Sequence, residues 1–214
     1  LAEKWGALDA PRPTGELYAM DANGKRGDLL VGYRARPDEP GLVSGRVVEP
    51  VAAFIADPLV GDERNVLISL WPFANDTSAR LERMDVITGR RVLVSRSPVQ
   101  RATFTTDNGG VLRFARGAAA DNVNKLYYRQ DDGRWTLLND EGSSQRIERP
   151  IGLSADNHLA YLEVEQARGP DSVVRWNPQI GEHRTRLQDS VRAPSFHTHH
   201  PRLRCPVGLT VDRE

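Results

Sequence analysis

The chain has 214 residues, in which 29 basic residues balance 29 acidic ones and hydrophobic residues make up 39%. Zero net charge removes the long-range attraction on which binding to nucleic acid or an anionic membrane surface depends, so we expect neither as a partner. Apolar runs such as Val66–Trp71 are far shorter than the roughly 20 residues that cross a bilayer. The one cysteine, Cys205, cannot form an internal disulfide, so the sequence assigns no compartment.

From the start of the chain, residues 1–14 form an initial segment around Trp5 without clear periodicity. A turn signature then recurs: an apolar run, a turn rich in Asp, Asn and Gly, and a second apolar run. The four copies are LYAMDANGKRGDLLV from Leu17, LERMDVITGRRVLVS from Leu81, LYYRQDDGRWTLLND from Leu126 and VVRWNPQIGEHRTRL from Val173. Each copy predicts a β-hairpin, because Asp and Gly provide the side-chain caps and positive φ angles that such turns require.

A second turn signal alternates with the first. The segments IADPLVGDERNVLISLW, TTDNGGVLRFA and SADNHLAYLEV each place a tight turn before a strand, and their aspartates Asp57, Asp107 and Asp156 are 50 and 49 positions apart. Equal spacing indicates a repeat, and several short strands per repeat of this size are typical of β-propeller blades and not of helical solenoids.

The sequence therefore predicts an all-β fold, a partial β-propeller of three to four four-stranded antiparallel blades. We expect the propeller to occupy residues 15–192, with an insertion rich in Pro and Gly after the first unit and an irregular tail over 193–214. The approximate units are 15–34, 51–95, 99–139 and 147–187. No helix longer than about three turns is expected between Val51 and Leu187.

The number of blades is too small for most closed rings. At about 45 residues per blade the chain has room for fewer than five, and closed propellers usually have four to eight. Together with Leu1, which is not a translation start, this count predicts part of a larger ring. Because a partial ring leaves blade faces open, we expect self-association or poor solubility of the isolated chain.

Strand patterns within the units indicate which side chains form the core. Ala160, Leu162 and Val164 alternate with polar residues, which predicts a strand with one buried face. Val66–Trp71 is apolar on both faces, as expected of a strand covered by sheets on both sides. The aromatic residues are spread through the units and are expected to pack between blades: Trp71, Phe104, Phe114, Tyr127, Tyr128, Trp135, Tyr161 and Trp176.

The combination of an S/T-x-D-N turn, a strand and an M-D-x-x-T-G turn resembles the propeller repeats of Tol-B-like proteins and of the prolyl oligopeptidase family of serine peptidases. Residues 80–142, from RLERMDVITGRRVLVS to LYYRQDDGRWTLLNDEG, look like the amino-terminal propeller of bacterial acylaminoacyl- or dipeptidyl-peptidase-like members. The resemblance covers roughly 15–182. It implies a following α/β-hydrolase domain with a nucleophilic serine on a G-x-S-x-G turn.

This chain has no such turn. The candidates GLSAD, with Ser154, and GSSQR, with Ser143, lack the second glycine that the sharp strand-to-helix turn requires. No catalytic residue of the family is therefore assigned here, and no cofactor is expected. Cys205 has no partner residues at a spacing typical of a nucleophilic site.

Other residues suggest chemistry but have simpler explanations. His197, His199 and His200 lie close together, and His at i and i+2 of an extended strand would share a face as two metal ligands can. No nearby Cys, Asp or Glu completes a set, so we expect a solvated tail and no metal. The repeated aspartates are expected to cap turns and not to act as acids or bases. The basic and aromatic run from Asp121 is explained by strand packing.

Two function classes remain. In the first, the chain is the non-catalytic propeller portion of a serine peptidase, which caps the α/β-hydrolase domain of the same parent chain and selects peptide substrates by size. In the second, it is a freestanding propeller that serves as a protein-interaction scaffold. A parent reading frame that continues for about 250 residues with G-x-S-x-G, a later Asp and a later His would favour the first.

Overall fold

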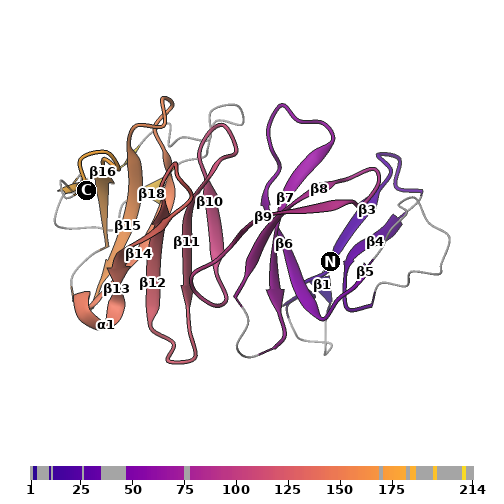
Figure 1. The fold of residues 1–214 in the computed structure, drawn as a ribbon, viewed down its shortest axis with the longest axis horizontal. Helices are drawn as coiled ribbons and strands as arrows, with labels where there is room; N and C mark the ends of the chain where they lie inside the picture. The colour runs from indigo at the N-terminus through magenta and orange to yellow at the C-terminus, as the bar shows by residue number, and fades with distance from the viewer. Residues whose placement is uncertain are drawn as a thin grey trace. The chain divides into compact units, whose positions relative to one another are not determined.

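The computed structural model of this protein is built almost entirely from β-strands (Figure 1). It describes residues 2–3, 10, 12–25, 27–34, 47–74, 78–168, 171–181, 184–186, 195–196 and 209–210. The chain divides into two compact units, Leu1–Ala102 and Thr103–Glu214.

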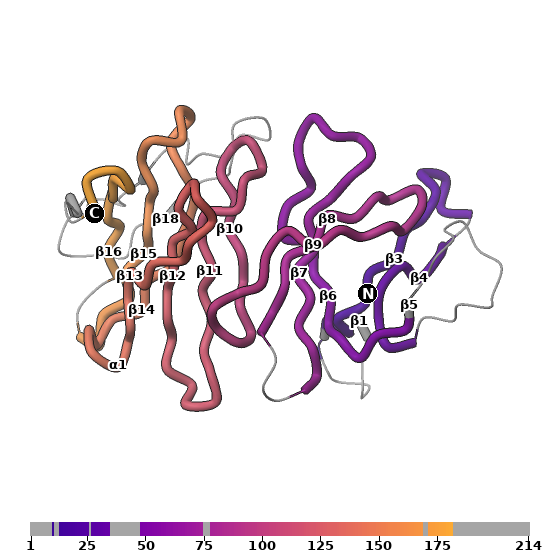
Figure 2. Tube along the Cα trace, viewed as in Figure 1, coloured from indigo at the N-terminus to yellow at the C-terminus, as the bar shows by residue number. Residues whose placement is uncertain are grey.

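The described residues of the first unit form three sheets. A short pair, β1 (Ala2–Glu3) and β2 (Arg12–Pro13), is followed by a three-stranded sheet and then by a four-stranded antiparallel sheet. The three-stranded sheet consists of β3 (Leu17–Met20), β4 (Gly27–Gly32) and β5 (Val47–Val48). The four-stranded sheet consists of β6 (Val51–Asp57), β7 (Asn65–Pro72), β8 (Arg80–Asp85) and β9 (Arg91–Arg96), which follow one another as consecutive hairpins (Figure 2).

Apolar side chains join these two larger sheets. Leu30 and Val31 of β4 share one buried cluster with Val51 and Ala53 of β6 and with further residues of β7 and β8. The backbone at Gly15 lies close to Ala52 of β6: a Cβ atom at position 15 would lie 2.7 Å from the Cβ atom of Ala52. The backbone N–H of Ala53 donates to the carbonyl of Gly15 at 2.7 Å, so glycine is required for this contact.

The second unit repeats the four-stranded arrangement twice. One sheet consists of β10 (Thr103–Thr106), β11 (Leu112–Ala118), β12 (Asn124–Arg129) and β13 (Trp135–Asp140). The other consists of β14 (Arg146–Leu153), β15 (Ala160–Gln166), β16 (Ser172–Trp176) and β17 (Arg184–Arg186). A short pair, β18 (Ser195–Phe196) and β19 (Leu209–Thr210), lies within the segment for which the sequence predicts irregular chain.

Aromatic rings form the contact between these two sheets. Phe114 and Tyr128 come from the first sheet and Trp176 from the second, and the three rings meet edge to face at centroid distances of 5.0 to 6.1 Å. Such pairs stabilise beyond the area that they bury. The expected inter-sheet packing of aromatic residues is confirmed for these three. Ala160, Leu162 and Val164 are buried, as their alternation predicts.

The all-β fold class is confirmed. Three sheets have the up-and-down order of propeller blades, and within each unit successive sheets contact through a shared apolar cluster. In two of these sheets the pairing of the third strand with the fourth has the same irregularity: the β8–β9 register skips Val94, and the β12–β13 register skips Leu138. The first sheet departs from the pattern, because its third strand follows the long connection 33–46 and runs parallel to β4.

The helix of the described residues is a single turn, α1 (Glu141–Ser144), between β13 and β14. The Asp140 carboxylate accepts a hydrogen bond from the Gly142 N–H at its start, and Gln145 adopts a left-handed conformation at its end. Because α1 buries none of its residues, it has no apolar stripe by which the sequence could have indicated it.

We expect Phe114→Ala to destabilise the second unit by about 4 kcal/mol, because it leaves a cavity between the two sheets. Urea unfolding followed by tryptophan fluorescence measures this loss. The control is Val111→Ala at a half-exposed position, with an expected change below about 0.5 kcal/mol. Equal losses in both variants would contradict the proposed role of the aromatic contact.

Candidate functional site

The three repeated aspartates cap turns, as expected from their spacing. In each turn a carboxylate oxygen accepts a hydrogen bond from the backbone N–H two residues further along the chain. The donors are Leu59, Gly109 and His158, at 2.5, 2.9 and 3.1 Å. Asp57 and Asp107 are buried, whereas Asp156 is exposed. All three carboxylates are therefore occupied by the local backbone.

Asparagines that follow two of these aspartates connect adjacent sheets. The Asn108 side-chain amide donates to the carbonyl of Ser154 at 2.7 Å and to Oδ1 of Asn157 at 2.8 Å. The backbone N–H of Asn108 donates to the same oxygen at 3.0 Å. Our sequence interpretation missed this bridge, although the D-N pair in both copies was its signal. In the first unit Pro58 follows Asp57 and has no N–H with which to donate.

Serine, aspartate and histidine side chains meet in the turn between β14 and β15. The Ser154 hydroxyl donates to Asp156, and Nδ1 of His158 lies 3.1 Å from the other carboxylate oxygen. These hydrogen bonds hold the pKa of Asp156 well below its usual range, and the one from the Ser154 hydroxyl contributes most to the shift. In a catalytic triad the histidine lies between serine and carboxylate, whereas here the carboxylate lies between the other two.

Both candidate serines take part in local structure. The Ser154 oxygen accepts a hydrogen bond from the Leu159 N–H at 3.0 Å, and the Ser143 hydroxyl donates to the Asp140 carbonyl at 3.1 Å. Among the described residues, neither hydroxyl donates to a histidine. Cys205 and the histidines at 197, 199 and 200 lie outside the described residues.

We predict that a fluorophosphonate probe labels no serine in this chain. The Ser154 hydroxyl donates to Asp156, whose lowered pKa makes it a poor base, and the Ser143 hydroxyl donates to a backbone carbonyl. Intact-mass spectrometry after incubation measures labelling, with a known serine hydrolase as positive control. Stoichiometric labelling that Ser154→Ala abolishes would contradict this assignment.

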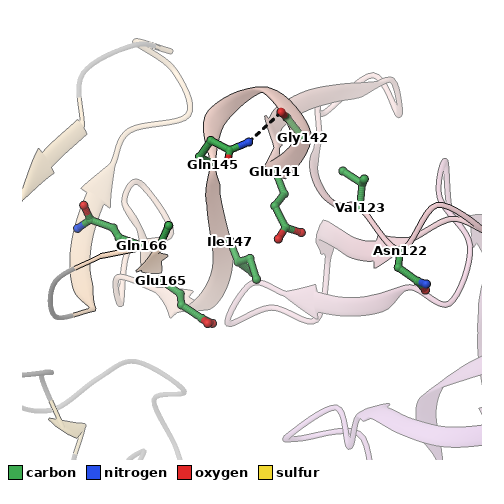
Figure 3. A pocket seen from close by; sticks show the side chains of 9 residues that line it. Asn122, Val123, Glu141, Gly142, Gln145, Ile147, Glu165 and Gln166 are labelled. Carbon is green, nitrogen blue, oxygen red and sulfur yellow. Dashed lines mark hydrogen bonds between the residues drawn. The ribbon is translucent and has the colours of Figure 1, made fainter.

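A polar pocket of about 320 Å³ lies in the second unit (Figure 3). Carboxylates of Glu141 and Glu165, side-chain amides and a few apolar groups line it. The Glu141 carboxylate accepts two hydrogen bonds from Asn124, which lower its pKa. Glu165 pairs with Arg149 at 2.5 Å. Both carboxylates therefore already have partners in the protein.

A larger groove of about 460 Å³ lies in the first unit. Its lining is mainly apolar and comes from β3 and β4 on one side and from β6, β7 and β8 with the following turn on the other. The large side chains of Met20, Ile55 and Ile87 lie at this groove, and they are 66%, 61% and 64% exposed. Tyr18 also lines it. An apolar groove bordered by exposed apolar side chains is a typical binding surface.

Ion pairs link neighbouring segments within the first unit. Glu49, before β6, pairs with Arg80 and Arg91, and Glu82 pairs with the same two arginines at 2.6 and 3.4 Å. Glu16, which is fully buried, accepts hydrogen bonds from Arg34 Nε at 2.8 and 3.0 Å. The Arg34 guanidinium holds the pKa of Glu16 below its ordinary value of 4.5.

We expect Glu16→Gln to destabilise the first unit by about 2 kcal/mol at pH 7, because a charged hydrogen bond to Arg34 is lost. The folded-state pKa of Glu16 is lowered, so its contribution is complete above the unfolded-state pKa and is lost as pH falls through the folded value. Urea unfolding between pH 7 and pH 3 should therefore show wild type and variant converging towards acid. A constant difference would contradict the ion-pair explanation.

Two further features bear on function. Within the described ranges, no group of three His, Cys, Asp or Glu side chains could hold a metal ion. No helix in that same part of the chain is long and apolar enough to cross a membrane.

Comparison with known proteins identifies no family. No protein-family model matches the chain. No curated protein matches it either. Among solved structures, TolB from Acinetobacter baumannii is similar, with a TM-score of 0.47 and 12% identity. The similarity covers 83% of this chain and 39% of TolB, so the chain spans about two-fifths of that protein's length. The fold assignment rests on the strand order and packing described above.

Proposed function

We propose that this chain is a non-catalytic binding module whose groove between β3 and β6–β8 receives apolar side chains of a protein partner. The observation that carries the proposal is the exposure of Met20, Ile55 and Ile87 around one apolar groove. Exposure of large apolar side chains to water is unfavourable, by about 25 cal/mol per Å² of apolar surface. A partner that covers these three side chains removes that unfavourable contribution, which favours binding.

The groove is better suited to side chains of a polypeptide than to a small polar ligand. Its lining includes one ionisable carboxylate, Asp21, and otherwise mostly aliphatic groups and the ring of Tyr18. Apolar pockets with few polar groups receive apolar and aromatic anchor residues in protein interfaces. The polar pocket of the second unit is the weaker candidate, because hydrogen bonds and an ion pair within the protein already occupy its carboxylates.

The partner takes one of two forms. The resemblance of residues 80–142 to peptidase propellers supports a partner in the same parent chain, an α/β-hydrolase domain that this module caps while it selects peptide substrates by size. The alternative is a separate protein bound to a freestanding scaffold. Because the groove requires only apolar anchors, both forms are consistent with it. The parent reading frame distinguishes them, since only the first requires a downstream nucleophile turn.

We predict that Met20→Glu and Ile55→Glu each weaken binding of the neutral apolar dye Nile red about tenfold, because each places a charge in the groove. Fluorescence titration of the purified chain measures the affinity. Ile180→Glu is the matched control, since Ile180 is 61% exposed and belongs to the second unit. Equal weakening by Ile180→Glu, or none by the groove variants, would contradict the assignment of the groove.

A partner assay tests the function itself. If the parent frame encodes a hydrolase domain, the full-length protein with Ile55→Glu should lose its preference for short peptides while it keeps labelling by a fluorophosphonate. If the frame encodes none, Ile55→Glu should weaken the complex with the separate partner. Unchanged selectivity and unchanged binding would reject a role of the groove in either form.

A further inference from the structure

The outermost strand of the first unit's four-stranded sheet presents an uncovered apolar segment. Val92, Leu93 and Val94 of β9 are 56%, 49% and 36% exposed. Among the described strands β9 pairs with β8 alone, so one row of its backbone N–H and C=O groups has no strand partner in that part of the chain. Such an edge is a template for pairing with another extended segment.

Exposure on both sides distinguishes β9 from an ordinary sheet edge. Leu93 stands opposite Glu82 and Val92 opposite Arg83, so these two neighbours point to opposite faces of the sheet. The skipped residue Val94 is exposed as well. Its counterpart in β13, Leu138, packs against the aromatic cluster of the second unit. The described residues of the first unit thus provide no equivalent cover for β9.

Positive charge surrounds this apolar segment. Residues 90–101 contain four arginines and no acidic residue. Arg91 is occupied by Glu49 and Glu82, whereas the exposed Arg90 and Arg96 form no ion pair with any described residue. Arg96 also stands directly opposite Arg80. Arg80 is itself paired with Glu49 and Glu82, so an acidic side chain of a partner would give Arg96 the ion pair that the described residues do not provide.

The same charges disfavour a second copy as the occupant of the edge. Antiparallel pairing of two β9 strands about their centre would place Arg91 of one copy opposite Arg96 of the other, at both ends of the contact. Arg96 of each copy would then face an arginine that already has its own acidic partners, and β9 itself has no acidic side chain to offer it. The edge is therefore complementary to an acidic segment and not to itself.

We propose that β9 binds an extended segment of another polypeptide, with alternating apolar side chains and acidic residues at its ends, as an added antiparallel strand. Backbone hydrogen bonds to the free edge provide affinity, while contacts with Val92 and Leu93 select apolar side chains. Arg90 and Arg96 select the acidic ends, so binding weakens as salt rises. This surface is separate from the groove and does not depend on the function proposed for it.

A synthetic peptide tests this proposal. The probe is a fluorescein-labelled peptide of alternating valine and threonine with two glutamates at each end, and fluorescence anisotropy measures its binding to the whole chain. We expect saturable binding that weakens about tenfold when the glutamates are replaced by lysine. N-methylation of alternate backbone amides should abolish binding, because it removes the strand hydrogen bonds.

Variants of the chain localise the binding. Arg96→Glu and Leu93→Asp should each weaken peptide binding about tenfold. Their matched controls are Arg134→Glu and Ile180→Asp, which change exposed side chains of the second unit and should bind as the wild type does. Urea unfolding shows whether both edge variants are folded. Leu93→Asp places a carboxylate opposite Glu82, so if this variant is destabilised, Arg96→Glu still tests the surface.

Three outcomes would overturn the proposal. Equal binding of the lysine and glutamate peptides would remove the charge complementarity. Equal binding of the N-methylated peptide would show that no strand is added. A dimer in sedimentation that Leu93→Asp dissociates, without peptide binding by the monomer, would assign the edge to a second copy.

Discussion

Apolar contact between successive sheets is the constraint on which this structure depends. A four-stranded sheet whose second strand is buried on both faces, as Leu67, Ile68 and Leu70 of β7 are, cannot be stable alone, because one face would remain in water. Within each unit a neighbouring sheet covers one such face, through Leu30 and Val31 of the preceding sheet in the first unit and through the ring of Trp176 of the following sheet in the second. The turns only have to reverse the direction of the chain between strands, and aspartate and asparagine side chains stabilise them by hydrogen bonds to the local backbone.

The sequence contains enough information for the fold class because its two turn signals alternate with a constant spacing. Asp–Gly turns and alternating apolar residues are local features, so the hairpins of β8–β9 and β12–β13 could be predicted without tertiary information. The bridge from Asn108 to Ser154 and Asn157 could not, since it joins residues 46 and 49 positions apart. The parallel return of β5 was equally hidden, because no local pattern fixes where a strand lies after a long connection.

For the candidate sites too, local features could be predicted from the sequence and long-range contacts could not. The sequence contains no G-x-S-x-G motif, and the hydroxyls of Ser154 and Ser143 form local hydrogen bonds, in a turn and in helix α1 respectively. The apolar groove was not predicted, because Met20, Ile55 and Ile87 lie far apart in the chain and each is unremarkable alone. Only the approach of β3 to β6–β8 brings them together. The exposed edge of β9 was hidden for a related reason: apolar alternation predicts a strand but does not show what covers it.

The central claim, that the groove of the first unit binds apolar side chains, is tested most directly by methyl NMR. The chain is labelled at its isoleucine methyl groups and titrated with a short capped peptide of leucine and phenylalanine. The account predicts shifts at Ile55 and Ile87 with no change at Ile180 or at Ile147, which lines the polar pocket. Shifts at Ile147 alone, or at none of the isoleucines, would contradict it.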